Sequence, residues 1–395
     1  MFVYADNAST TQPDERVYDA MKPYFMDVYG NSSSLHAMGR NALAAADRAR
    51  GLIAQSINAS DSEIYFTSGG TESDNWAITG VAKALEGKGR HIITTSIEHP
   101  AVLNSCKELE RQGWEITYLP VDSVGLIDLT QLERSIRDDT VLISVMWANN
   151  EIGSVMPINE IGRIARGRGV YFHTDAVQAA GSIAIDVKHN NIDLLSISGH
   201  KLYGPKGVGV LYKRNGVKCS SFMKGGEQER GQRAGTLNIP AIVGMGEALK
   251  YACYNMSDDN AKIKSVRDYF IRRVRADISD VKYNGPTEDN LRLCGNANFT
   301  FNNVNGDVLL ARLDMEGICA SSGAACSSGT SEPSHVLLAI GASEDAARST
   351  LRFSWGKYNS MEEVDYTVDR LKAIIAELRE STTLFKTIKG EDKYV

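Results

Sequence analysis

Seven short β-rich runs alternate with helical stretches between residues 63 and 212, and this alternation limits the possible folds. The runs, of which TVLISVMW is one, are apolar enough to be buried: residues 63–67, 91–96, 115–120, 140–147, 170–175, 193–198 and 207–212. Strands that alternate with helices favour a mostly parallel sheet with helices on both faces. We therefore expect an α/β fold whose large domain has a mostly parallel seven-stranded sheet.

The pattern changes after about residue 260. A long polar helical stretch, AKIKSVRDYFIRRVRADI, is followed by the strand-like segments NANFTFNN and STLRFSW and by a closing helix in 361–379. This order predicts a smaller α+β domain, and a chain of 395 residues is long enough for two or three domains. We place the large domain at 15–258 and the small domain at 1–14 and 259–395.

Charge and composition narrow the possible partners and the location. The net charge is −6 and no long basic run occurs, which argues against a nucleic-acid or membrane-surface partner. No leader-like N-terminus and no window of about 18 apolar residues is present, so a cytoplasmic location is expected. The six cysteines are scattered without CxxC pairs, which predicts reduced thiols and no metal site.

Five polar clusters each follow a predicted strand: TSGGTES, IEHP, ANNEIG, HTDAVQ and SGHKLYGPKG. Ligands bind at the carboxyl ends of strands in an open α/β sheet, so the five clusters predict one site. Any one of them could equally consist of ordinary turn residues. The set is explained better by a shared ligand.

Three features of these clusters indicate the kind of ligand. Two glycines and a threonine precede a helical pattern at 73–86, where free N–H groups favour a phosphate. Lys201 lies at a strand-to-loop junction, where a lysine can serve as a Schiff-base amine. Asp175 ends an apolar strand and needs a cationic partner, which a pyridinium nitrogen would supply. Pyridoxal phosphate requires all three.

Further segments make the resemblance specific: DNAST, GNSSSLH, GGEQERGQRAGT, SSGAACSSGTSEPSHVL and LRFSWG. Together with the five clusters they resemble, in order and spacing from about residue 4 to 380, the cysteine desulfurases. These are fold-type I pyridoxal phosphate enzymes of the class V aminotransferase group. The resemblance implies a sulfurtransferase that converts L-cysteine to L-alanine and leaves a persulfide on Cys326. The sulfur would serve iron-sulfur cluster assembly or another thiolation pathway.

The resemblance also implies roles for individual residues. Lys201, His99 and Cys326 would be catalytic: Lys201 would form the Schiff base, His99 would stack on the ring and shuttle protons, and Cys326 would take the sulfur. Residues that would hold the cofactor's ring or phosphate are Gly70, Thr71, His99, Asn150, Asp175, Gln178, Ser198, His200, Lys201 and Thr236. Asn150 and Arg352 would bind the substrate carboxylate. Thr236 would reach the phosphate of a neighbouring subunit, which implies a homodimer.

The segment around Cys326 resembles the longer loop of the NifS/IscS type rather than the short loop of the SufS type, which implies delivery of sulfur to an acceptor or scaffold protein. The chain departs from the family pattern at Gly70, Trp355 and Lys357, and its end at 384–395 resembles the partner-docking end only loosely. Two alternatives remain. One is a related pyridoxal enzyme, such as a selenocysteine lyase or an aminotransferase, and the other is a non-catalytic sulfur carrier.

Overall fold

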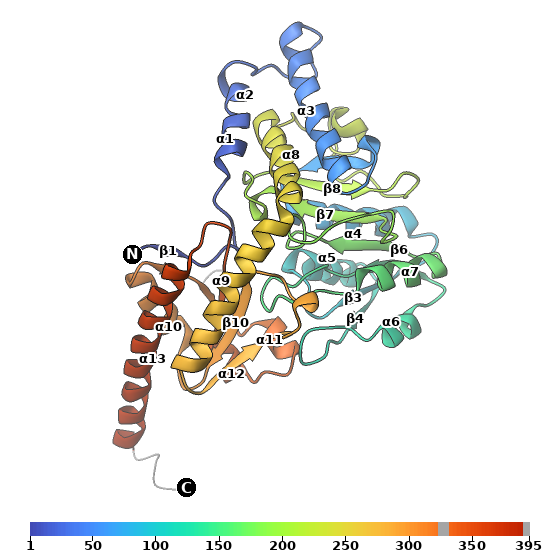
Figure 1. Cartoon of the computed structure of the whole chain (residues 1–395). Helices are drawn as coiled ribbons and strands as arrows, with labels where there is room; N and C mark the ends of the chain where they lie inside the picture. The colour runs from blue at the N-terminus through green and yellow to red at the C-terminus, as the bar shows by residue number, and fades with distance from the viewer. Residues whose placement is uncertain (323–331, 390–395) are drawn as a thin grey trace.

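The computed structural model describes residues 1–322 and 332–389, with side chains as far as residue 381 (Figure 1). Cys326, the predicted sulfur acceptor, lies outside the described residues. The side chains of the predicted docking segment 384–395 lie outside them as well.

The larger sheet has seven strands in the order β2-β8-β7-β6-β5-β3-β4. The strands are β2 (Ile64–Thr67), β3 (His91–Thr95), β4 (Glu115–Leu119), β5 (Thr140–Ser144), β6 (Tyr171–Asp175), β7 (Leu194–Ser198) and β8 (Gly209–Lys213). Only β8 runs against its two neighbours. The predicted seven-stranded, mostly parallel sheet is confirmed, and each strand overlaps one of the predicted runs.

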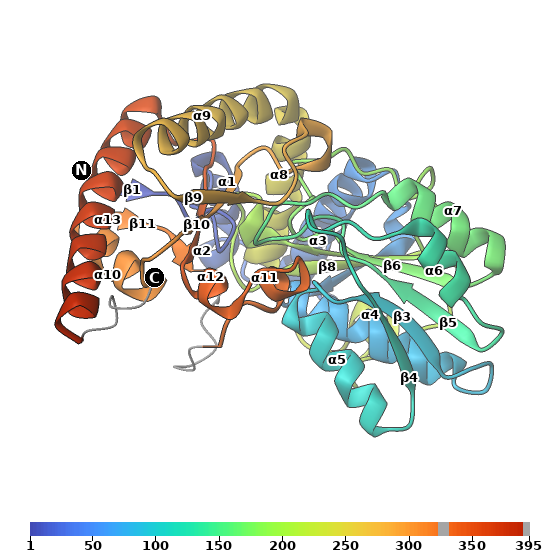
Figure 2. The same cartoon turned by 90° about the horizontal axis from the view of Figure 1, so that it is seen from below.

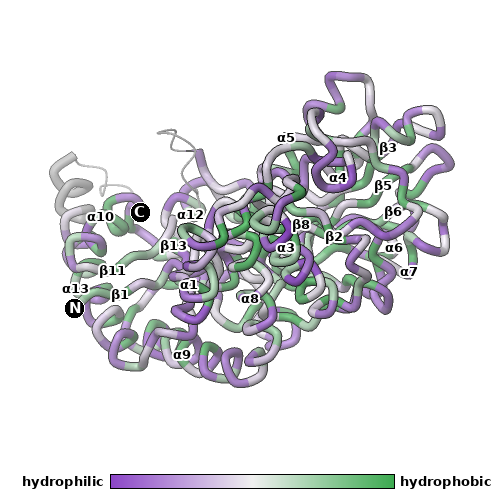
Figure 3. Tube along the Cα trace, turned by 90° about the horizontal axis from the view of Figure 1, so that it is seen from above, coloured by the Kyte–Doolittle hydropathy of each residue, from purple (hydrophilic) through white to green (hydrophobic). Residues whose placement is uncertain are grey.

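Apolar side chains of successive strand residues enter core clusters on opposite faces of this sheet. In β8, Val210 and Tyr212 pack in the cluster that includes α3, α7 and α8, whereas Leu211 packs in the cluster with α4 and α5. Figure 2 shows α4 and α5 on the opposite side of the sheet from α6 and α7, and Figure 3 shows hydrophobic residues along the strands. Helices therefore cover both faces, as a mostly parallel sheet requires.

The helices connected with the larger sheet are α1 (Glu15–Met21), α2 (Pro23–Met26), α3 (Ala37–Ser56), α4 (Gly70–Leu85), α5 (Pro100–Arg111), α6 (Leu129–Ser135), α7 (Ile158–Arg168) and α8 (Ile239–Tyr254). Their ends follow from local sequence. Pro100 begins α5, where the missing N–H has no intrahelical role, and Gly169 ends α7 in the left-handed region at φ 65°.

A second, antiparallel sheet has the order β12-β13-β10-β9. Its strands are β9 (Val281–Asn284), β10 (Asn296–Phe301), β12 (Ser321–Ser322) and β13 (Thr350–Ser354), and it packs with α9 (Met256–Asp277), α10 (Gly306–Met315) and α13 (Met361–Lys389). β1 (Val3–Tyr4) pairs in parallel with β11 (Ile318–Cys319), so the N-terminal segment joins this part of the molecule.

Two short helices follow the segment that contains Cys326: α11 (His335–Ala339) and α12 (Glu344–Arg348). Their buried apolar residues, which include Val336 and Leu337, pack in the core of the larger sheet. The division at residues 14/15 and 258/259 stays a prediction. Over the described ranges 1–322 and 332–389, no helix combines the length and apolarity needed to cross a bilayer.

Candidate active site

A cavity of about 290 Å³ lies at the carboxyl edge of the larger sheet. The predicted site residues that line it are Gly70, Thr71, His99, Asn150, Asp175, Gln178, Ser198, His200, Lys201 and Arg352. Strands β2, β3, β6 and β7 end here, and β13 of the smaller sheet brings Arg352. Thr236 is exposed and is not part of this lining. The cavity thus joins ten of the predicted residues from both sheets.

The first turn of α4 forms an anion-binding wall of the cavity. A Cβ atom added to Gly70 would lie 2.7 Å from Val177 Cγ2, so glycine allows the helix end to approach closely. No side chain of the described residues caps this turn, which leaves N–H groups free at the positive end of the helix dipole. Ser198, His200 and Lys206 line an adjoining hollow that also contains Thr71. This set suits a phosphate.

Lys206 was not among the predicted site residues, although it lies in the quoted segment SGHKLYGPKG. Burial, with Lys201 and Lys206 adding to it, lowers the pKa of His200 to about 4. Its ring is therefore neutral at pH 7, and Nδ1 lies 3.1 Å from Thr10 Oγ1. The cationic side chain at this wall is therefore Lys206 and not His200.

Lys201 follows β7 and points toward the N-terminal segment. Its Nζ donates hydrogen bonds to the carbonyl oxygens of Ala8, at 2.7 Å, and Ser9. Burial and then the charge of Arg352 lower the pKa of Lys201 to about 8, while Asp6 and Asp175 act in the opposite direction. A substantial fraction of neutral amine at physiological pH is what attack on a carbonyl carbon requires.

Asp175, the last residue of β6, is only 6% exposed. Its Oδ1 accepts a hydrogen bond from the backbone N–H of Val177 at 2.9 Å, and it forms no ion pair with any described residue. Burial raises its pKa, although His99 and Lys201 act in the opposite direction. A protonated ring nitrogen would supply the missing cation, so this residue fits the expected cofactor.

His99 caps the first turn of α5. The backbone N–H of Ala101 donates to its Nδ1 at 3.1 Å, so a neutral ring carries its proton on Nε2. Burial lowers the pKa of His99, an effect that Asp175 partly counters and Lys201 reinforces. The side chain is thus a neutral proton donor at the edge of the cavity.

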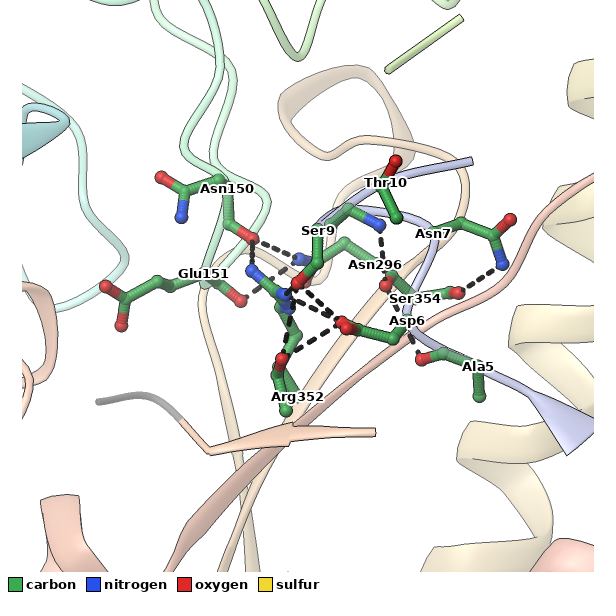
Figure 4. Close-up of polar contacts among 12 residues, drawn as sticks. Ala5, Asp6, Asn7, Ser9, Thr10, Asn150, Glu151, Asn296, Arg352 and Ser354 are labelled. Carbon is green, nitrogen blue, oxygen red and sulfur yellow. Dashed lines mark hydrogen bonds and ion pairs between the residues drawn. The ribbon is translucent and has the colours of Figure 1, made fainter. Parts of the chain in front are cut away.

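Arg352 is held by the N-terminal segment and by the loop after β5. Its Nη1 donates to the Asn150 carbonyl oxygen at 2.9 Å, and its Nη2 donates to Asp6 Oδ1 at 2.9 Å and Ser9 Oγ at 2.7 Å (Figure 4). Its buried Nε has no hydrogen-bond partner among the described residues. The backbone oxygen of Asn150, not its amide, contacts this arginine.

Several residues that shape the site were missed in the sequence. Asp6, Ala8 and Ser9 belong to DNAST, a quoted segment to which no role was given, and Gln178 Nε2 donates to the same Ala8 oxygen as Lys201. The available signal was a polar run directly after a β-rich start. The residues that this run contacts, Lys201 and Arg352, are however distant in the sequence.

Two buried carboxyl groups were also missed. Asp74 lines the cavity; its Oδ1 has no hydrogen-bond partner in the described part of the chain, and burial together with Asp175 raises its pKa. Glu98, next to His99, is fully buried, and burial raises its pKa to about 8. Acidic residues in IEHP and TESDN read as surface residues by type alone.

Comparison with known proteins defines the class. Residues 3–367 match the family model of the class-V aminotransferases. Cysteine desulfurases IscS of Clostridium botulinum and Dictyoglomus turgidum are 48% and 50% identical to this chain, over 97% and 95% of both sequences. A solved NifS-like protein matches 95% of this chain and all of its own, with a TM-score of 0.90 and 37% identity. The chain therefore belongs to the cysteine desulfurases of the class-V aminotransferase family.

The predicted family, fold and enzyme class are thereby confirmed. The human cysteine desulfurase, at 46% identity over 98% of this chain and 84% of its own length, agrees with them. The family implies pyridoxal phosphate as cofactor, cysteine as substrate and a sulfur acceptor in general terms.

Proposed function

We propose that this chain binds pyridoxal 5'-phosphate in the described cavity, converts L-cysteine to L-alanine and transfers the sulfur to Cys326. One observation carries the proposal: Lys201, with a pKa of about 8, shares a cavity with the buried, unpaired carboxyl of Asp175 and with the guanidinium of Arg352. An amine, an acid and a carboxylate receptor around one cavity match the parts of an amino-acid-converting pyridoxal site.

The residues present fit the cofactor. Asp175 would pair with the pyridine nitrogen, Gln178 would contact the ring hydroxyl, and His99 would lie against the ring. The phosphate would be held by the backbone at Gly70 and by the side chains of Thr71, Ser198 and His200, and Asn150 would join Arg352 at the substrate carboxylate. When bound, pyridoxal phosphate supplies the electron sink that allows the substrate Cα–H bond to break.

The chain's own residues would bind the substrate and move its protons. Arg352 binds the α-carboxylate, for which a guanidinium is the suitable planar donor. Nζ of Lys201 accepts the proton that the substrate Cα loses, and Nε2 of His99 carries a second proton. The sulfur of Cys326 attacks the sulfur of the substrate: an S–S bond forms, the Cβ–S bond breaks, and Cβ gains a proton. One L-cysteine and one thiol give one L-alanine and one persulfide, with no further oxidant or reductant.

A homodimer would complete the site. Thr236, expected at a cofactor phosphate, is exposed and away from this chain's cavity, so it suits the cavity of a second copy. Exposed apolar side chains of the segments 25–35 and 222–223 would be covered in a dimer: Phe25, Met26, Tyr29, Leu35, which is 91% exposed, Phe222 and Met223. The segments around Ser33 and Leu237 lie side by side, because both residues line one hollow. We place the dimer in the cytoplasm and propose an iron-sulfur scaffold or another thiolation protein as sulfur acceptor.

The test is to incubate the purified holoenzyme with L-cysteine and dithiothreitol and to quantify sulfide and alanine. Wild type should release both in equal amounts, and Cys326→Ala should release neither. Cys319→Ala is the matched control, because this half-buried thiol lies seven residues earlier and should leave turnover unchanged. Undiminished products from Cys326→Ala would contradict the assigned sulfur acceptor. A wild type that yields no alanine would favour the non-catalytic carrier.

A further inference from the structure

Helix α9 has one face in the core and a second face against α13. The core face carries Val266, Phe270 and Val274. On the side of α13, Arg273 forms ion pairs with three carboxylates: Asp277, Asp365 and Asp369. The charge of Arg273 is therefore neutralised within the molecule. Arg272 and Arg275, the neighbouring arginines of α9, line a hollow on a different face of the helix.

The third face of α9 lines a hollow of about 640 Å³, which we call the α9 groove. The charged part of its helical wall extends from Lys264 to Arg275, and its opposite wall is the segment from Tyr283 to Arg292. Figure 2 shows α9 running beside β9. Eleven helical steps of ~1.5 Å give the groove a length of about 17 Å. A hollow of this length is larger than a single phosphate needs.

The α9 groove carries an excess of positive charge. It is lined by five cationic side chains and two carboxylates: Lys264, Arg267, Arg272, Arg275 and Arg292 against Asp268 and Asp289. Lys264 and Arg267 each pair with both carboxylates, at distances between 2.6 and 3.1 Å. Arg272, Arg275 and Arg292 have no carboxylate partner anywhere in the described residues. This excess lies in a chain whose net charge is −6.

Arg292 makes the excess charge most evident, because it is only 5% exposed. Its donors reach backbone carbonyls, including those of Asn284 and Pro286, and the side chain of Asn296, but no acid. The guanidinium carbons of Arg275 and Arg292 lie 5.1 and 4.1 Å from the ring centre of Tyr283. Burial, with Arg267 and Arg275 adding to it, lowers the pKa of Arg292 to about 10. Two guanidinium groups on one ring without a counter-charge favour an anion.

We propose that the α9 groove binds an extended acidic peptide segment of a partner protein. At ~3.3 Å per residue, about five residues of extended chain span the groove. Acidic side chains of such a peptide would pair with the exposed guanidinium groups of Arg272 and Arg275, and the buried charge of Arg292 would add to the attraction. None of these three lines the catalytic cavity, so the groove is a docking surface. The proposal does not depend on the desulfurase chemistry.

The probe is a fluorescein-labelled hexaglutamate peptide, titrated with holoenzyme and followed by fluorescence anisotropy. The double variant Arg272→Gln/Arg275→Gln should weaken binding at least about tenfold, because exposed, unpaired arginines supply the attraction. Arg134→Gln/Arg163→Gln is the matched control, because it removes the same amount of positive charge. Both arginines are exposed and pair with no carboxylate in the described ranges. Thermal unfolding and cysteine turnover of both variants should equal those of wild type.

Three results would overturn the proposal. The first is an absence of wild-type binding up to about 1 mM peptide, the weak limit of a useful contact. The second is an equal loss of binding in the control variant, which would mean attraction to any positive surface. The third comes from inorganic pyrophosphate as competitor: displacement of the peptide with an affinity at or above the peptide's own would assign the groove to a small phosphate. Binding that persists against pyrophosphate and weakens between about 50 and 200 mM salt supports the peptide.

Discussion

The stability of the variant Glu98→Gln, compared with wild type at the same pH, should increase as the pH rises. Both carboxyl oxygens of Glu98 accept from the backbone N–H of Met146, at 2.9 and 3.1 Å, and Oε1 accepts from Thr95 Oγ1 at 2.7 Å. Burial raises the pKa of Glu98 from 4.5 to about 8; Asp175 adds to this effect, and the hydrogen bonds oppose it. At neutral pH the folded chain therefore keeps a proton that the unfolded chain has lost.

The direction and size of the effect follow from proton linkage. Between pH 4.5 and about 8 the folded state binds the extra proton, so the free energy of unfolding falls as the pH rises. The loss is ~1.4 kcal/mol per pH unit, or about 5 kcal/mol over the window. Glu98→Gln removes this titration, because the uncharged amide of glutamine replaces the protonated carboxyl group and does not titrate. For a chain of this length, about 5 kcal/mol corresponds to roughly 6 °C in Tm.

Scanning calorimetry of both holoenzymes at one scan rate between about pH 5 and 8 measures the difference. The Tm of Glu98→Gln relative to wild type should rise steadily with pH across this range. Glu86→Gln is the control, because Glu86 is about half exposed and pairs with Arg90 at the surface, where loss of an ion pair should change the Tm little. A Tm difference for Glu98→Gln that stays flat or falls with pH would mean that Glu98 is charged in the folded enzyme.

Four further substitutions test the site and its support. Arg352→Lys loses the planar fork and should raise KM for L-cysteine by about 30-fold, with a smaller change in kcat, in steady-state assays. Asp74→Asn should keep turnover within about threefold, because burial and the charge of Asp175 raise the pKa of Asp74 and favour its uncharged form. Asp175→Asn should lower turnover at least about a hundredfold. Glu229→Gln breaks the buried pair with Arg50, whose Nη atoms lie 2.7 and 2.9 Å from its carboxylate, and should lower Tm by about 4–6 °C. A Tm within about 1 °C of wild type would refute that last expectation.

Much of the sheet and of the cavity could be predicted because both depend on local pattern. The run VYFHTD begins with three apolar residues and ends at Asp175, and this one segment predicted a strand, its carboxyl end and a buried acid. Parallel strands place such ends at one edge, which explains how His99 and Lys201, 102 residues apart, line one cavity. Turn residues after strands were informative because the topology assembles them.

Other parts of the site depend on packing that no local pattern carries. Asp6 and Arg352 are separated by 346 residues, and their contact requires the N-terminal segment to lie beside β13. Asp74 lies on a helix that contacts several strands, so only the three-dimensional structure shows it to be buried. Sequence periodicity predicts which face of a helix is buried, but it does not predict which polar atoms that face contacts.

The N-terminal segment also explains how residues from two sheets share one cavity. The backbone oxygen of Ala8 accepts hydrogen bonds from Lys201 and Gln178, and the backbone N–H of Ala8 donates to Ser354 Oγ at 2.8 Å. Asp6, two residues earlier, holds Arg352. The pKa of Lys201 responds to both partners of that ion pair, since Arg352 lowers it and Asp6 raises it. A shift of this short segment would therefore move the carboxylate receptor and change the basicity of the catalytic amine together.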